Sequence, residues 1–302
     1  MVKRPDKDIV EIFGYAPDDF SSTCRSLWKL GACPFVAKPC TKTNHDKTIT
    51  YGTCSVTSPS GDCIICPNRL YEKQYAVLRK VSKDVFGDEL DFLTYEEYIP
   101  RRNEQSKYIV ALGQTSGKEI KLGNSLSMDW VLAKISQGKL LEYVGIEVQS
   151  LDTTGNYRDN WYAYKNLADS NAVIPRSGHG MNWANVHKRL IPQLIRKGLI
   201  YSRSKLVRSG LYFIVPEIVY QKFENIIGED IPLVSEKAPD VITVHTYSLS
   251  PPASKHGEMR SIVCEREVRF KLEDFSDRFI SGVNLPSGED LDNAICRGLG
   301  LL

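Results

Sequence analysis

Two short stretches near the middle of the chain alternate between apolar and polar residues in a way that predicts two β-strands. The first is Met128–Leu132, which contains Asp129, and the second is Leu140–Gln149, which carries Glu147 near its end. Side chains alternate across a strand, so Glu147 and Gln149 project from one face while their apolar neighbours pack on the other. Carboxylates therefore stand where a buried strand would carry apolar residues.

Apolar periodicity elsewhere predicts both helices and strands. Apolar residues that recur every three or four positions predict a helix over residues 68–87, capped by Asn68 and ended by Gly87. A second amphipathic helix over residues 185–197 is expected to end at Gly198 and to kink or split at Pro192. Further helices are expected at residues 160–167 and 219–223, and strands at residues 108–112, 117–122, 211–215, 240–247 and 261–270. The mixture predicts an α/β fold with a mixed central sheet flanked by helices.

Six of the eight cysteines fall in a short polar segment, namely Cys24, Cys33, Cys40, Cys54, Cys63 and Cys66. The residues between them are too poor in apolar side chains to hold together by burial, and a thiolate-bound metal can supply the folding energy. Only Cys63 and Cys66 have the C-x-x-C spacing, so the residues leave open which four thiols would bind. Such a site suits zinc or iron, with free or disulfide-bonded cysteines as the alternative.

The composition is that of an ordinary globular protein, and its 302 residues suffice for one large domain or two smaller ones. No run is apolar enough to cross a bilayer, and the first residues lack the apolar core of a signal peptide. We therefore expect a cytoplasmic protein, whose thiols are kept reduced, and this favours metal over disulfides. The net charge of +2 neither requires nor excludes a nucleic-acid partner.

Charge is nevertheless distributed unevenly along the chain. Between Ser170 and Pro216 there is no acidic residue. The basic residues of this interval are Arg176, Lys188, Arg189, Arg196, Lys197, Arg203, Lys205 and Arg208. They form either an ordinary solvated face or a surface that contacts DNA phosphates, whose neutralisation dominates DNA affinity.

Two carboxylates on neighbouring strands can hold a hard cation such as Mg²⁺, which prefers oxygen ligands and keeps several waters. The metal can bind a phosphodiester oxygen and acidify a bound water. Gln149 can orient that water by hydrogen bonding, although a lysine is more usual in this role and would also supply positive charge. Glu119, on the preceding strand, is either a third metal ligand or a solvated residue, and we favour the second interpretation.

Several motifs occur in an order that resembles the PD-(D/E)xK nucleases and, more closely, the NotI-like type II restriction endonucleases. The resemblance covers most of the chain and fades after about residue 225. The matching segments are Ile12–Gly14, Cys33–Phe35, Gly52–Cys54, Cys66–Arg69, Met128–Ala133, Tyr143–Asp152 and Asn182–Arg189.

The resemblance implies a PD-(D/E)xK endonuclease core over residues 71–302 that binds DNA, preceded by a metal-binding module over residues 1–70. It implies a catalytic set of Asp129, Glu147 and Gln149, with Mg²⁺ at the two carboxylates. It also implies a structural metal, iron in the family, at Cys33, Cys40, Cys54 and Cys66, with Cys63 a bystander. The expected protein is a homodimeric enzyme of a prokaryotic restriction–modification system, cutting a GC-rich palindrome such as CGGCCG with a 5′ stagger.

An alternative of a different class is a metal-finger DNA-binding regulator without catalysis. Residues 190–200 followed by a basic hairpin resemble part of a winged helix, and the carboxylates would then be incidental. The Asp-Trp and Glu-x-Gln motifs favour the nuclease, because a regulator has no reason to carry them.

Overall fold

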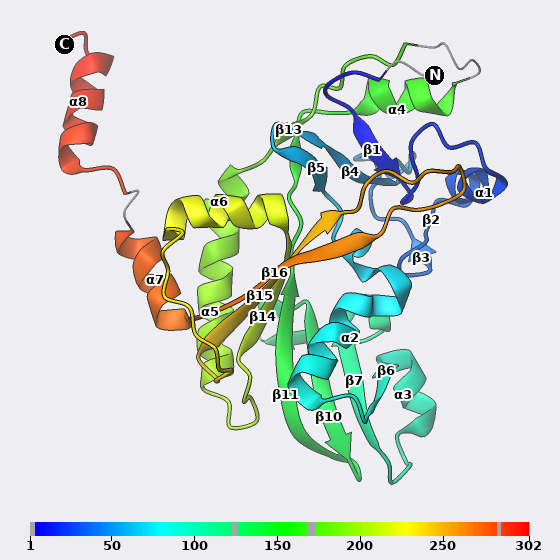
Figure 1. Ribbon diagram of the computed structural model, residues 1–302, viewed down its shortest axis with the longest axis vertical. Coiled ribbons are helices and arrows are strands. Elements are labelled where there is room, and N and C mark those ends of the chain that lie inside the picture. Colours follow the sequence, from blue (N-terminus) through cyan, green and yellow to red (C-terminus); the bar gives the residue numbers. More distant parts are fainter. Residues whose placement is uncertain (1–3, 123–125, 168–172, 283–284, 302) are drawn as a thin grey trace.

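A seven-stranded mixed sheet forms the centre of the computed structural model, which describes residues 4–122, 126–167, 173–282 and 285–301 (Figure 1). In spatial order the strands are β16 (Ile262–Lys271), β15 (Val241–Leu249), β14 (Leu211–Pro216), β11 (Lys139–Val148), β10 (Trp130–Ser136), β7 (Lys107–Gly113) and β6 (Asp91–Thr94). Strands β11, β14 and β15 run parallel, as do β6 and β7. The other pairs are antiparallel.

Helices cover both faces of this sheet, and the alternation of side chains along the strands explains why. On one face, α5 (Ile191–Ser202), α6 (Glu217–Ile227) and α7 (Leu272–Ser281) pack on residues such as Phe213 and Val215 (Figure 1). On the other face, α2 (Glu72–Phe86) packs on the intervening residues, including Tyr212 and Ile214. The two sets of apolar residues make two core layers, which confirms the predicted mixed α/β sheet flanked by helices.

The N-terminal part adds a small antiparallel sheet of β1 (Ile9–Ile12), β4 (Thr53–Ser58) and β5 (Gly61–Ile64). It also contains α1 (Ser22–Leu30) and a hairpin of β2 (Ala32–Cys33) and β3 (Lys38–Pro39). Its apolar residues are not separate from the rest, since Cys33, Cys54 and Ile64 belong to the same cluster as strands β10 and β11. Helix α4 (Arg158–Lys165) packs against β1 from much later in the chain.

The chain contains several further elements. They are the helices α3 (Tyr95–Tyr98) and α8 (Gly288–Gly298), the 3₁₀ turns Pro67–Tyr71, Ile99–Arg101 and Gln114–Ser116, the π-helical turn Val186–Leu190, and the strands β8 (Ile120–Leu122), β9 (Leu126–Met128), β12 (Thr153–Thr154) and β13 (Gly180–Met181). Helix α8 stands clear of the body and buries none of its residues (Figure 1). Among the described residues, no helix is long and apolar enough to cross a membrane.

Three predictions of where helices and strands begin or end were wrong. Asn68 does not cap a helix, because it lies in a 3₁₀ turn whose Arg69 is drawn into buried ion pairs. Gly198 does not end α5, which continues to Ser202. A Cβ atom at Gly198 would lie 2.8 Å from Leu272 Cδ1, so glycine there permits close packing of α5 on α7. Of the strand expected at residues 117–122, only Ile120–Leu122 forms.

Candidate active site

Asp129 and Glu147 face each other at the point where strands β10 and β11 separate. The last pair of this antiparallel ladder joins Trp130 to Ile146, so the next position places Asp129 opposite Glu147. Asp129 lies in the break between β9 and β10 rather than inside one strand as expected. Its Oδ2 accepts a hydrogen bond of 3.0 Å from the backbone N–H of Val148, which holds the carboxylate at the mouth of the break.

Trp130 anchors this break on the other face of the sheet. Its Nε1 donates a 2.9 Å hydrogen bond to the hydroxyl of Tyr71, and its ring packs on Tyr75. The indole also lies over Gly113, where a Cβ atom would come within 2.5 Å of it. Because neighbouring side chains point to opposite faces, burying Trp130 on the α2 side turns Asp129 toward α5.

Helix α5 runs along β11, so that every fourth residue of the helix lies beside every second residue of the strand. Tyr201 lies over Gly145, and Lys197 pairs with Glu147. Four residues of a helix rise about 6 Å and two residues of a strand about 6.6 Å, so the match can continue over several positions. One step further, Gln193 and Gln149 line the same cavity.

Glu147 is almost fully buried, with 6% of its surface exposed. Burial is the main cause that raises its pKa, to about 8, and the nearby charge of Asp129 adds to the effect. The Lys197 ammonium donates to Glu147 Oε2 and acts in the opposite direction. Glu147 Oε1 is also buried, and within the described part of the chain no donor reaches it.

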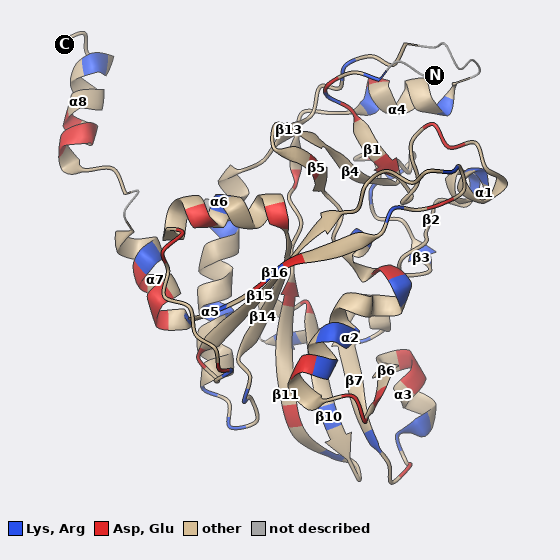
Figure 2. Cartoon of the chain, viewed as in Figure 1, with Lys and Arg blue, Asp and Glu red and all other residues tan. Residues whose placement is uncertain are grey.

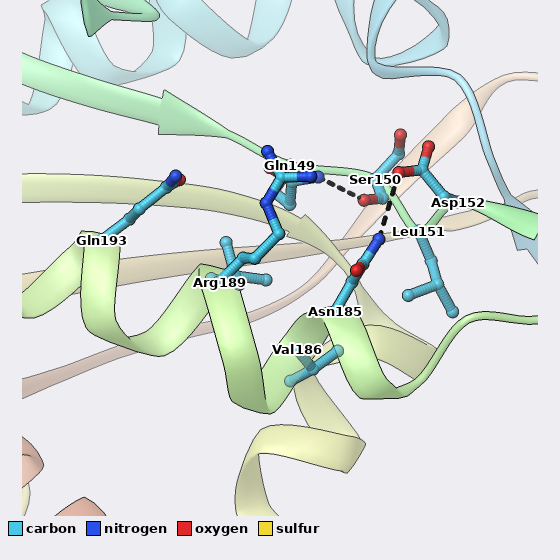
Figure 3. A pocket seen from close by; sticks show the side chains of 9 residues that line it. Gln149, Ser150, Leu151, Asp152, Asn185, Val186, Arg189 and Gln193 are labelled. Atoms are coloured by element: carbon cyan, nitrogen blue, oxygen red, sulfur yellow. Dashed lines mark hydrogen bonds between the residues drawn. The ribbon is translucent and has the colours of Figure 1, made fainter. Parts of the chain in front are cut away.

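These side chains surround a cavity of about 130 Å³. It is lined by Leu126, Ser127, Asp129, Glu147, Gln149, Leu190, Gln193, Leu194 and Lys197. A neighbouring cavity of about 100 Å³ shares Gln149 and Gln193 with it and adds Arg189 and Asn185 (Figure 3). In Figure 3 the side chains of Arg189 and Gln193 rise from the helix toward the strand end at Gln149. The Gln149 amide donates a 2.7 Å hydrogen bond to the carbonyl of Ser150, which leaves its own side-chain oxygen able to accept.

The donor set fits a hard divalent cation. Asp129 and Glu147 supply carboxylate oxygens, one of them buried without a donor among the described residues, beside a polar cavity with room for water. Glu119 does not line this cavity, and its carboxylate pairs with Lys121 at 3.1 Å. Its placement agrees with the interpretation of Glu119 as a solvated, ion-paired residue.

Lys197 differs from the other basic residues of the acid-free interval. We expected it on a surface that contacts DNA, but only 5% of it is exposed and it lies in the carboxylate cavity. A helical signal in the sequence could have revealed this position, because Lys197 falls on the same face as Leu194 and Tyr201, three before it and four after it. With a helix that ends at Gly198, Tyr201 lies outside the helix and the apolar face around Lys197 cannot be recognised.

The remaining basic residues of the interval are exposed, namely Arg176, Lys188, Arg189, Arg196, Arg203, Lys205 and Arg208. Arg176 pairs with Asp6 at 3.0 Å. Figure 2 shows basic residues on the loop that follows α5, beside the end of the sheet. Ser170, which opens the interval, lies outside the described residues.

The cysteines of the N-terminal part fall into two groups. The pKa values of Cys40, Cys54 and Cys66 are raised by burial and also by the charges of neighbouring thiols, and Cys33 is among those neighbours. For Cys63, burial and Asp62 raise the pKa to about 12, with no contribution from another thiol. Even so, no set of three or more His, Cys, Asp or Glu side chains in the described ranges is arranged to hold a metal ion. Among the described residues, Cys33, Cys40, Cys54 and Cys66 therefore lie near one another without forming a group that could ligate a metal ion.

The segment after α5 does not form the basic hairpin on which the regulator interpretation depended. Residues 211–216 form β14, which pairs in parallel with β11 and β15 inside the central sheet. No protein-family model matches the chain, and no curated protein matches it significantly. The geometry of the site is therefore the basis for inferring what the protein does.

Proposed function

We propose that the protein is a type II restriction endonuclease of the PD-(D/E)xK superfamily, which hydrolyses double-stranded DNA with Mg²⁺. The observation that carries this proposal is the pairing of Asp129 with Glu147 at the open end of β10 and β11, with Gln149 just beyond. The buried Glu147 oxygen that receives no donor within the described residues is the second support, because a cation would satisfy it.

In this mechanism Asp129 and Glu147 hold the metal. Bound there, Mg²⁺ would acidify a water and stabilise the charge that develops on the phosphodiester. Val148 keeps Asp129 in place through its backbone N–H. Gln149 orients the attacking water through its side-chain oxygen, since its amide nitrogen is already engaged with Ser150. Proximity and orientation of this kind account for a large share of the barrier reduction in such reactions.

DNA would be held by the exposed basic residues of the acid-free interval. Arg189 lines the neighbouring cavity, which shares Gln149 with the carboxylate cavity, and from there it can contact a phosphate or the edge of a guanine. A twofold homodimer would place one cavity on each strand of a palindrome. A GC-rich palindrome such as CGGCCG, cut to leave 5′ overhangs, is the substrate that we propose.

Plasmid and bacteriophage DNA incubated with the protein test the proposal. We expect discrete fragments with Mg²⁺ and none with EDTA, and sequencing of the fragment ends gives the site and the stagger. Asp129→Ala and Glu147→Ala proteins should bind the same DNA with Ca²⁺ but not cut it. If either variant cuts at the wild-type rate, the assignment of the site is wrong.

We also propose that Cys33, Cys40, Cys54 and Cys66 bind one structural metal ion, iron or alternatively zinc. Their proximity supports this choice of four, because Cys33, Cys40 and Cys54 pack in one cluster and Cys66 lies close enough to Cys54 to raise its pKa, although as described they form no ligating group. Elemental analysis of the purified protein tests it. Cys54→Ser should lose the metal, whereas Cys63→Ser, at a similarly buried position, should keep it. A native protein without metal would contradict the proposal.

A further inference from the structure

Residue 149 is a glutamine, so the strand does not carry the positive charge that a lysine would bring to this position. We infer that Lys197 supplies this charge from helix α5, on the opposite wall of the same cavity. The inference rests on the proposed nuclease function and deepens it by adding a fourth side chain to the reacting site.

Two independent constraints hold Lys197 in this position. One helical turn after Lys197, the contact of Tyr201 with Gly145 fixes the position of α5 on β11. The absence of a side chain at Gly198 lets the same helix approach Leu272 of α7. Lys197 directly precedes Gly198 and lies one turn before Tyr201, so both contacts fix the stretch of helix from which its ammonium reaches Glu147.

Stability does not explain why both charges are buried. An ion pair that is desolvated contributes little to folding compared with apolar side chains of similar volume. The helix face around Lys197 carries the buried Leu190, Leu194 and Tyr201, and Gln193 is its other polar side chain at the cavity. A lysine on this face, aimed at a cavity lined by two carboxylates, is better explained by chemistry at the cavity.

The charges of the site give Lys197 a specific effect. Asp129 and Glu147 bring two negative charges and Lys197 one positive charge, so a site that has bound a divalent cation carries a net positive charge. Without Lys197 the same site would be neutral. A positive site stabilises the negative charge that develops on a phosphodiester, and preorganised charges of this kind act mainly on the transition state.

Lys197→Met tests the inference, with Lys83→Met as the control. Lys83 is an exposed lysine on α2, which covers the opposite face of the sheet. On a duplex containing the mapped site, Lys197→Met should lower kcat about 100-fold, as removal of one preorganised donor does in other enzymes. The KM for DNA should not change, and the control should cleave as the wild type does. If the methionine variant does not fold, Lys197→Gln serves the same purpose because it keeps a donor for Glu147.

A second readout needs neither DNA nor cleavage. Calorimetric titration with Mn²⁺ at several pH values compares the two proteins in the high-pH limit, where the Glu147 carboxylate is ionised in both. In that limit Mn²⁺ should bind Lys197→Met more tightly than the wild type, because a competing positive charge has been removed. If Lys197 only supported the fold, its loss would loosen the carboxylates and weaken Mn²⁺ binding. Placing the ammonium on the strand, in the double variant Lys197→Met/Gln149→Lys, should recover part of kcat.

The outcomes separate the inference from the proposed function. Wild-type kcat in Lys197→Met, or weaker Mn²⁺ binding, overturns the role of Lys197. The nuclease function stands in that case as long as Asp129→Ala remains inactive. Absence of any Mg²⁺-dependent cleavage by the wild-type protein overturns the function, and with it the inference.

Discussion

The ring of Tyr201 lies directly on Gly145, so that a Cβ atom at residue 145 would come within 2.0 Å of its Cζ. This contact connects helix α5 to strand β11 two residues before Glu147 and one helical turn after Lys197. Because Gly145 has no side chain, α5 can pack close to β11, and this packing places Lys197 beside Glu147.

Gly145→Ala should therefore affect both stability and activity. The added methyl group forces Tyr201 and α5 away from β11, at a cost of about 1–3 kcal/mol in the free energy of unfolding, as expected for overpacking. Urea denaturation measures this, and cleavage should fall because Lys197 moves away from Glu147. Gly288→Ala, where an added Cβ would meet no described residue within 4 Å, is the control and should change neither. An unchanged stability for Gly145→Ala would show that α5 can shift freely.

Arg69, the last residue of the Cys-Pro-Asn-Arg motif, has a structural role. It is fully buried, pairs with Glu11 at 3.0 Å and Glu72 at 2.7 Å, and donates to the carbonyl of Arg260 at 2.6 Å. Removing one partner of a buried pair costs about 3–5 kcal/mol, because the other charge remains buried. We expect Arg69→Met to lose that amount in chemical denaturation.

A double-mutant cycle checks the cause of that loss. Arg69→Met combined with Glu11→Gln should be less destabilised than the sum of the two single variants, since one of the two carboxylates that lose Arg69 is then neutral. If the loss of stability in the double variant equals the sum of the losses in the two single variants, Arg69 and Glu11 do not interact energetically.

The exposed basic residues should control the salt dependence of DNA binding. For every phosphate that the protein no longer neutralises, the slope of log K against log salt becomes shallower by about 0.9. Arg203→Ala and Arg208→Ala, measured by fluorescence anisotropy with Ca²⁺ in place of Mg²⁺, should each reduce the slope by up to this amount. Lys197→Met should leave it unchanged, because Lys197 is buried. Equal slopes for all variants would place the DNA on another surface.

His245 should make the stability of the fold depend on pH. It is fully buried in β15, both ring nitrogens lack a hydrogen-bond partner among the described residues, and burial lowers its pKa to about 4 although Glu267 acts in the opposite direction. An unfolded histidine titrates near pH 6.5. Between these values the unfolded chain binds the extra proton, so stability is lost as the pH falls from about 6.5 toward 4, by about 1.4 kcal/mol per unit at most.

Replacing this histidine isolates its contribution. The free energy of unfolding of His245→Leu should fall less steeply over the same pH interval than that of the wild type. The two proteins can be compared by urea denaturation at several pH values. Parallel pH profiles would show that other groups cause the loss.

Much of the fold could be predicted from local patterns. The strands around Tyr108–Leu112, Leu211–Val215 and Asp240–Tyr247 were predicted because apolar β-branched and aromatic runs form buried strands almost regardless of their neighbours. The end of α2 at Gly87 was predicted for a similar reason, since its left-handed φ of 82° favours glycine. Strand alternation predicted that Glu147 and Gln149 project from one face, and both line the cavity that Asp129 also lines.

What the sequence by itself determined is the set of elements and the face on which each strand residue lies, because these depend on residues close together in the chain. Only the tertiary structure decided that Asp129 lies in a break between strands, that α5 continues through Gly198, and that Lys197 is buried against Glu147. These features depend on contacts between residues far apart in sequence, such as Tyr201 with Gly145 and Gly198 with Leu272. A local pattern contains no information about which distant surface a helix will cover. The pairing of Lys197 with Glu147 is therefore determined by the packing of α5 on the sheet.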